Sequence, residues 1–266
     1  MIVDWISNNP TWLWGGIFVA VTTLIACLGL LTVNRFVGIK SRKPHNDAAQ
    51  AFIGVIGTAY AVLVAFLAVA AWQQFTDASK ATMEEANFIG DLYQDTTGLH
   101  DAQAQSIRND IKVYLNLVIK QEWPLQRRGE IDHVGHPTLS RIHRTIVAIN
   151  PTTPGEAVVQ AELLRTMNEL YNARRERQLA AMGAIPSIVW WIIALGTAMT
   201  VCYSYVFGVD NVRMHLLMTG SMMAALALVI VLIVALDRPF RGDLSIGTDA
   251  YDNMLAGLHA DGTISE

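Results

Sequence analysis

Long apolar runs without a single charged residue recur four times along the chain. They cover 13–33, 48–76, 185–207 and 214–236. A membrane-spanning helix needs about 20 predominantly apolar residues, and each run meets that length. No stretch shows the sustained period-two alternation of a strand. The pattern therefore predicts an all-α polytopic membrane protein with four transmembrane helices and a helical insert between the second and third.

Polar residues divide the chain around these spans. We expect 1–76 to hold an N-terminal segment and the first two spans, 77–184 to form an extramembrane insert, 185–236 to hold the last two spans, and 237–266 to be a polar C-terminal tail. Between 73 and 184 the sequence has 14 acidic and 12 basic residues, which indicates contact with water. No proline lies between Pro44 and Pro124, so the second span can continue outward as one long helix.

Two apolar stripes within the insert have helical spacing. The first comprises Ile107, Ile111, Tyr114, Leu115 and Val118, and the second comprises Val159, Leu163, Met167, Leu170 and Tyr171. Such stripes predict helices with one buried face. We expect the first of these helices to end at Trp123-Pro124, 125–137 to be a loop, and a short helix to cover 138–149.

The second span is unusually rich in small residues. Gly54, Gly57, Thr58 and Ala61 belong to this set, together with further alanines. In lipid, small side chains let helices approach closely and pack. We therefore expect this helix to contact other helices, copies of itself included.

Overall composition excludes several classes of function. Charged residues make up only 16% of the chain, against about 25% in soluble domains, and the net charge of -4 gives no basic surface for nucleic acid. Cys27 and Cys202 both lie in apolar runs and suit packing better than a disulfide framework. No charged residue lies within a span, which removes the usual marker of proton relays and coupled transporters. Phosphate-loop and hydrolase motifs are also absent from the sequence, so we expect neither an enzyme nor a cofactor.

The charges near the membrane ends leave the orientation open. Five Lys or Arg residues lie in the two short loops, between spans one and two and between spans three and four, while six lie on the opposite side. The positive-inside rule counts such residues. A difference of one residue does not decide which side faces the cytoplasm.

Several local motifs resemble those of the bestrophins. Asp-x-Pro-Phe-x-Gly-Asp-Leu follows the last span at 237–244, and His45-Asn46, Glu85-Ala86 and Glu122-Trp123 lie at matching places. The chain is more similar still to a bacterial family of bestrophin-like membrane proteins. The resemblance implies a homo-oligomer, pentameric as in bestrophins, that conducts small inorganic ions across the bacterial inner membrane. It also implies that the insert and both termini face the cytoplasm.

The same resemblance implies which residues line the pore. In bestrophins the second helix surrounds the pore and narrows it with apolar side chains, and the segment AVLVAF resembles that part of the helix. This match would place Thr58, Val62 and Phe66 on the pore axis. Their i, i+4, i+8 spacing puts them on one face of a helix. An apolar ring can gate a channel by dewetting, while ordinary helix packing is the alternative explanation.

The sequence also departs from the bestrophin pattern. The arginines that follow the bestrophin constriction are missing, since this chain has Leu67-Ala68 at that point. The bestrophin acidic cluster that binds calcium after the last span is represented only by Asp243, Asp249 and Asp252. Ion selectivity therefore does not follow from the resemblance.

Acidic residues gather just beyond the second span. We expect a cation-attracting vestibule there, formed by Asp77, Glu84, Glu85, Asp91 and Asp95. The alternative is an ordinary solvated helix face. Asp132, His133, His136 and His143 also suggest zinc, but structural zinc sites commonly include cysteine in tight spacing, so we expect no metal site.

A second function is compatible with the same sequence. The protein could be a non-conducting structural or sensory membrane module whose helical insert binds a partner. If the face of the second span that carries Thr58, Val62 and Phe66 is buried between other spans of the same subunit, the module is favoured. A span-two face turned toward a wide aqueous path would favour the channel.

Overall fold

The structure is a computed structural model and describes residues 10–131, 133–183 and 185–264; within these, side chains are described except those of 101 and 260–264. All regular elements in these residues are helical, and four of the helices are long and apolar enough to cross a membrane. This confirms the predicted all-α membrane fold. Contacts divide the described residues into two compact units, 10–74 with 185–237 and 242–244, and 75–183 with 238–241 and 245–264.

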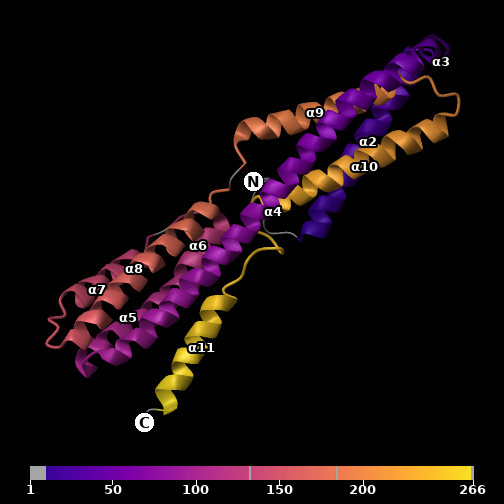
Figure 1. The fold of residues 1–266 in the computed structure, drawn as a ribbon. Coiled ribbons are helices and arrows are strands. Elements are labelled where there is room, and N and C mark those ends of the chain that lie inside the picture. Colours follow the sequence, from indigo (N-terminus) through magenta and orange to yellow (C-terminus); the bar gives the residue numbers. More distant parts are fainter. Residues whose placement is uncertain (1–9, 132, 184, 265–266) are drawn as a thin grey trace. The chain divides into compact units, whose positions relative to one another are not determined.

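The first unit contains the membrane-spanning helices (Figure 1). Its elements are α2 (Thr11–Phe36), α3 (Ile39–Arg42), the 3₁₀ turn η1 (Lys43–His45), the first part of α4 (Asn46–Asp95), α9 (Ser187–Val206) and α10 (Val212–Leu236). The second unit contains the rest of α4, η2 (Thr96–Gly98), α5 (Asp101–Leu117), the π-helical segment η3 (Val118–Glu122), α6 (Trp123–Arg128), α7 (His136–Val147), α8 (Pro154–Ala180) and α11 (Asp249–Ile264).

Glycines allow close packing between helices of the first unit. A Cβ added at Gly15 of α2 would lie 2.8 Å from Val231 of α10, and one at Gly29 would lie 2.6 Å from the Tyr205 hydroxyl of α9. By contrast, Gly54 and Gly57 of α4 have open space where a Cβ would be. These two glycines therefore do not serve close helix contacts within the described residues.

Instead, α4 is attached to α9 by an aromatic side chain. The Tyr60 hydroxyl donates to the Ile193 carbonyl at 2.8 Å and lies 2.6 Å from Thr197 Oγ1. The ring of Tyr60 rests on Gly196, where an added Cβ would come within 2.2 Å of it. This contact fixes which side of α4 faces the rest of the first unit.

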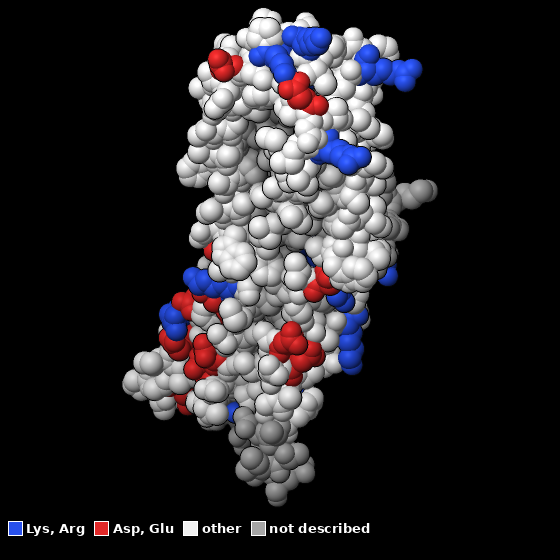
Figure 2. Space-filling view, turned by 90° about the vertical axis from the view of Figure 1, so that its right-hand side faces the viewer, with Lys and Arg blue, Asp and Glu red and all other residues white. Residues whose placement is uncertain are grey.

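Charged side chains of the first unit gather at the end where α3 lies, and the surface between its ends is largely uncharged on the face shown in Figure 2. The charged residues at this end include Arg35, Lys40 and Lys43, with Lys43 paired to Asp210 at 2.5 Å. An uncharged belt bordered by charge is the distribution that a bilayer imposes on a spanning protein.

The second unit has its own buried core, between the end of α4 and helices α5, α7, α8 and α11. Both stripes predicted from the sequence contribute to it. All five residues of the first stripe are buried, as are Leu163, Met167 and Leu170 of the second, while Val159 and Tyr171 are partly buried against the core. The expected buried faces are confirmed.

The prediction for 123–137 was partly wrong. The helix does not end at Trp123-Pro124, because α6 continues to Arg128 and closes at Gly129, whose φ is +79°. Pro124 is tolerated since it lies in the first turn after the π-helical segment, where its missing N–H disturbs the hydrogen-bond ladder least.

The C-terminal segment is more ordered than a polar tail. Helix α11 contributes Tyr251 and Leu258 to the buried core of the second unit, with Ala250, Met254 and Leu255 partly buried beside them. Ala250, Met254 and Leu258 have i, i+4, i+8 spacing, and with Tyr251 and Leu255 they form an amphipathic stripe that the overall acidity of the tail concealed. Phe240, within the Pro-Phe motif, packs edge-on against Trp123 with ring centroids 5.4 Å apart.

Candidate functional site

The membrane-spanning part of α4 has two unlike faces. Tyr60 and Val64 are buried against the first unit, whereas Val62 is 50% exposed and Phe66 is 71% exposed. Two positions along an α-helix correspond to a rotation of about 200°, so Val62 and Phe66 point away from the Tyr60 face. Thr58 is exposed on the same side. The structure thus brings the three predicted constriction residues together on one uncovered face.

This face continues as an apolar stripe along the span. Besides Val62 and Phe66, its large exposed side chains are Phe52, Val55, Val69 and Trp72. The Thr58 hydroxyl donates to the carbonyl of Gly54 at 2.6 Å, so even this polar side chain satisfies its donor within the helix. We call this uncovered set, from Phe52 to Trp72, the apolar stripe. The apolar stripe is therefore a hydrophobic surface that offers water no hydrogen-bonding partners.

Four of the five expected vestibule residues reach the surface of the second unit. Asp77 and Asp91 are exposed, Glu84 lies 3.5 Å from Lys80, and Asp95 is partly exposed near Thr166. Burial, followed by the nearby Glu162 charge, raises the pKa of Asp95 above its usual value. These carboxylates retain the exposure that a role in attracting cations requires.

Glu85 differs from the other four, because it is completely buried. Its carboxylate accepts a hydrogen bond from Arg177 Nε at 2.6 Å, and the Tyr114 hydroxyl donates to its other oxygen. Arg177 is also fully buried. A carboxylate enclosed in this way does not meet solvent ions, so its placement beside Glu84 in the sequence is misleading.

Glu122 completes a buried ion network with a second arginine. Arg174 donates to both carboxylate oxygens of Glu122, at 2.9 and 2.5 Å, and the Gly135 amide donates to one of them at 2.8 Å. Arg177 reaches the same carboxylate at 3.2 Å. Burial alone would raise the pKa of Glu122, but the hydrogen bonds and charges of the two arginines outweigh it and lower that pKa.

The network is therefore electrically balanced and joins four helical segments. Glu85 and Glu122 supply two negative charges, and Arg174 and Arg177 supply two positive ones, from α4, η3 and α8. Tyr114 of α5 bonds to both Glu85 and Arg174. We call this set the ion network. Its chemistry is that of a structural clamp, since its charged groups are directed at one another.

The sequence contained a signal for the network that spacing could have revealed. Arg174 and Arg177 continue the 4-3 spacing of the apolar stripe through Leu163, Met167 and Leu170. A charge in phase with an apolar stripe is expected to be buried, and buried charges require partners. Glu85 and Arg177 are 92 residues apart, however, so spacing alone does not identify the pair.

The histidines considered for zinc do not converge on a metal site in the part of the chain that the structure describes. No group of three or more potential His, Cys, Asp or Glu ligands occurs among those residues. His136 and His143 instead lie beside the Tyr171 ring, with centroids 6.3 and 6.2 Å away. Asp132 falls outside the described residues.

Comparison with known proteins places this architecture in a family. A model of the bestrophin-like domain matches residues 20–251. Two crystallised variants of a bacterial bestrophin homolog from Klebsiella pneumoniae have similar folds. The first has a TM-score of 0.70 at 13% identity, covering 91% of this chain and 99% of the homolog. The second has 0.69 at 13% identity, covering 92% and 98%.

A crystallised membrane protein variant is also similar, with a TM-score of 0.68 at 11% identity over 91% of this chain and 97% of that one. No curated protein gave a match. At such low identity the structural matches establish the fold alone, whereas the domain model covers most of the sequence. The chain belongs to the bestrophin-like family.

Proposed function

We propose that this protein is an oligomeric ion channel of the bacterial inner membrane, with α4 lining its pore. The narrowest part is formed by Thr58, Val62 and Phe66. Membership of the bestrophin-like family supports a channel. The observation that carries the assignment to α4 is its uncovered apolar stripe, which lies opposite the face attached to α9.

The attachment through Tyr60 determines what α4 can present to other subunits. Among the described residues, its buried face packs within the chain, and the stripe with Val62 and Phe66 has no large covering segment. If copies surround an axis with this face inward, equivalent side chains form rings. A ring of phenylalanines excludes water when narrow and passes hydrated ions when wide. The open surfaces of Gly54 and Gly57 leave room for neighbouring copies of α4.

The exposed carboxylates beyond the span would act next along the ion path. Asp77, Glu84, Asp91 and Asp95 would raise the local concentration of cations, because clustered charge of one sign attracts its counter-ions. Glu85 is not part of this set, since it is neutralised within the ion network. The constriction itself carries no charge, so the carboxylates determine the ion preference.

Flux through reconstituted protein tests the proposal. The full chain is placed in liposomes with known gradients of small inorganic salts, and wild type is compared with Phe66→Ala. Replacing the phenylalanine side chains around the axis by alanine should lower the barrier that dewetting imposes on ions and raise the flux several-fold. Phe36→Ala is the matched control, because Phe36 is also exposed but belongs to α2. Its flux should equal that of wild type, and salt gradients would report the preferred ion sign.

Two outcomes would overturn the assignment. Unchanged flux in Phe66→Ala, with the oligomer intact, would exclude this side chain from the constriction. Absence of flux in every variant would instead favour the non-conducting membrane module. Cross-linking of cysteines introduced along the stripe would then show whether copies of α4 face one another at all.

A further inference from the structure

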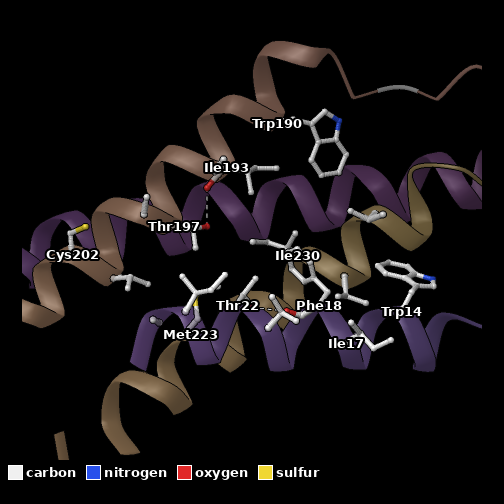
Figure 3. Close-up of a pocket in the computed structure, with 18 of the residues that line it drawn as sticks. Trp14, Ile17, Phe18, Thr22, Trp190, Ile193, Thr197, Cys202, Met223 and Ile230 are labelled. Carbon is white, nitrogen blue, oxygen red and sulfur yellow. Dashed lines mark hydrogen bonds between the residues drawn. The ribbon is translucent and has the colours of Figure 1, made fainter. Parts of the chain in front are cut away.

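A large cavity lies in the first unit between α9 on one side and α2 with α10 on the other (Figure 3). It is open at the surface, since lining residues such as Val21, Ile25 and Ala198 are exposed. Its volume is about 780 Å³, within the range of about 300–1,000 Å³ typical of small-molecule sites. Nearly all of its lining is apolar. The lining includes Ile17, Phe18, Ile193, Ala198, Met223 and Ile230.

The few hydroxyl groups in the lining already have partners within the protein. Thr22 donates to the Phe18 carbonyl at 2.7 Å, Thr197 to the Ile193 carbonyl at 2.8 Å, and Tyr205 to the Ala26 carbonyl at 2.8 Å. Ordinary ligand sites keep several convergent polar groups to orient a ligand. Here those hydroxyls are turned to backbone carbonyls, so the cavity favours a ligand portion that needs no hydrogen bonds.

The location of the cavity narrows the choice further. All of its lining belongs to helices long and apolar enough to span the bilayer. An apolar cavity does not hold water well, and an empty one forfeits dispersion contacts along its walls. Lipid hydrocarbon is the apolar material present at high concentration around such helices. A flexible acyl chain can also adapt to the shape of the cavity between α9 and α2.

Two tryptophans mark one end of the cavity. Figure 3 shows Trp14 and Trp190 near the same end and Cys202 at the opposite one, with the indole nitrogens of both tryptophans on the outer side. Trp12 and Trp191, their neighbours in sequence, are exposed. Tryptophan is enriched at the membrane interface, where the ring stays in apolar surroundings and the N–H meets polar groups. This end therefore corresponds to the level of the lipid headgroups.

We propose that the cavity binds one acyl chain of a membrane phospholipid as a stably held ligand. The headgroup lies at the tryptophan end, and the hydrocarbon runs between α9 and α2 toward Cys202. The bound chain fills the space that separates α9 from the closely packed α2 and α10. Since Tyr60 attaches α4 to α9, the lipid supports the position of α4. The binding itself does not depend on ion conduction.

A photoreactive phospholipid tests the position of the chain without any substitution. The probe carries a diazirine near the end of one acyl chain and is mixed into liposomes containing the full-length wild-type protein. After illumination, labelled peptides should concentrate on lining residues near Cys202. Equal labelling of exposed residues outside the cavity, such as Leu24 and Leu217, would overturn the proposal.

Filling the cavity tests whether the lipid is held. Phospholipid that remains bound after detergent exchange is counted by native mass spectrometry in wild type and in Ala198→Phe. The bulky ring should reduce the retained phospholipid from one molecule per chain to nearly none. Ala20→Phe is the matched control, because Ala20 is exposed on α2 outside the lining, and it should retain the lipid.

Three results would contradict the proposal. Full retention in Ala198→Phe would place the lipid elsewhere, and co-purification of free fatty acid alone would exclude the phospholipid. Cross-links from the cavity to a second copy of the chain, in place of lipid, would identify a neighbouring subunit as the occupant. If Ala198→Phe fails to fold, the photolabelling of wild type still decides. A failure of the channel assignment would leave these measurements unaffected.

Discussion

The two units satisfy their buried polar groups in different ways. In the first unit, polar side chains bond mainly to backbone carbonyls, as Tyr60 does with Ile193 and Tyr205 with Ala26. Even the buried Arg42, at the end of the spans, donates to the carbonyl of Tyr205 at 2.6 Å. In the second unit, the buried Glu85 and Arg177 bond to each other. The buried arginine of the first unit thus relies on neutral partners, and the buried arginines of the second rely on opposite charges.

The surrounding solvent explains the difference. A polar side chain in hydrocarbon has no water to return to, so helix carbonyls and hydroxyls near it are the available partners. The second unit carries many exposed charged side chains, as a protein that folds in water does, and in water a charge stays solvated until it pairs. Its buried ions then depend on every member of the network. The first unit should therefore be sensitive to added volume, and the second to the loss of a charge.

The largest effect is expected from removing a cation of the ion network. Arg177→Ala leaves Glu85 buried without its main partner, which should reduce the stability of the second unit by about 3–5 kcal/mol. Hydrogen exchange followed by mass spectrometry would show faster exchange in α5 and α8. Arg175→Ala is the matched control, because Arg175 is exposed on the same helix, and exchange should remain near wild type. Equal effects of both variants would argue against a special role for the network.

A smaller effect is expected from adding volume where α4 meets α9. In Gly196→Val the new side chain collides with the Tyr60 ring, and overpacking typically costs about 1–3 kcal/mol. The thermal unfolding temperature of the detergent-solubilised protein should fall accordingly. Gly16→Val supplies the comparison, since open space surrounds Gly16. If both variants unfold at the same temperature, close approach at Gly196 is not what holds α4.

The smallest effect is expected from mild acid. The pKa of Glu122 is lowered by folding, so its contribution to stability is fully present above the usual glutamate pKa, about 4.3. It is lost only as pH falls through the lower, folded-state pKa. Wild type should therefore exceed Glu122→Gln in stability by the same amount at pH 7 and pH 5, measured by denaturant unfolding. The two should converge in stronger acid, and convergence already near pH 6 would contradict the assignment.

Features set by local patterns were predictable from the sequence. The four spans follow from charge-free runs, because a bilayer excludes charge over a known length. The buried stripe from Ile107 to Val118 follows from helical spacing, and the common exposed face of Thr58, Val62 and Phe66 follows from the same geometry. The pore role of that face remains a prediction.

Features set by distant contacts were not predictable in the same way. Glu85 looked like one more surface acid beside Glu84, because its partner Arg177 lies on another helix far along the chain. The amphipathic stripe of α11 was hidden within an acidic tail, and its buried Tyr251 becomes evident only against Trp123, 5.5 Å away between ring centroids. The cavity in the first unit depends on how three helices diverge, which no single segment encodes.

The π-helical segment at Val118–Glu122 changes the direction in which the side chains after it point around the helix axis. A π turn accommodates one residue more than an α turn, so the helix beyond it is rotated relative to the helix before it. Winding the same residues as a regular α-helix would swing Trp123 and Gln126 by about 100° around the axis. The angular setting of one aromatic ring and one amide thus rests on a single extra peptide unit.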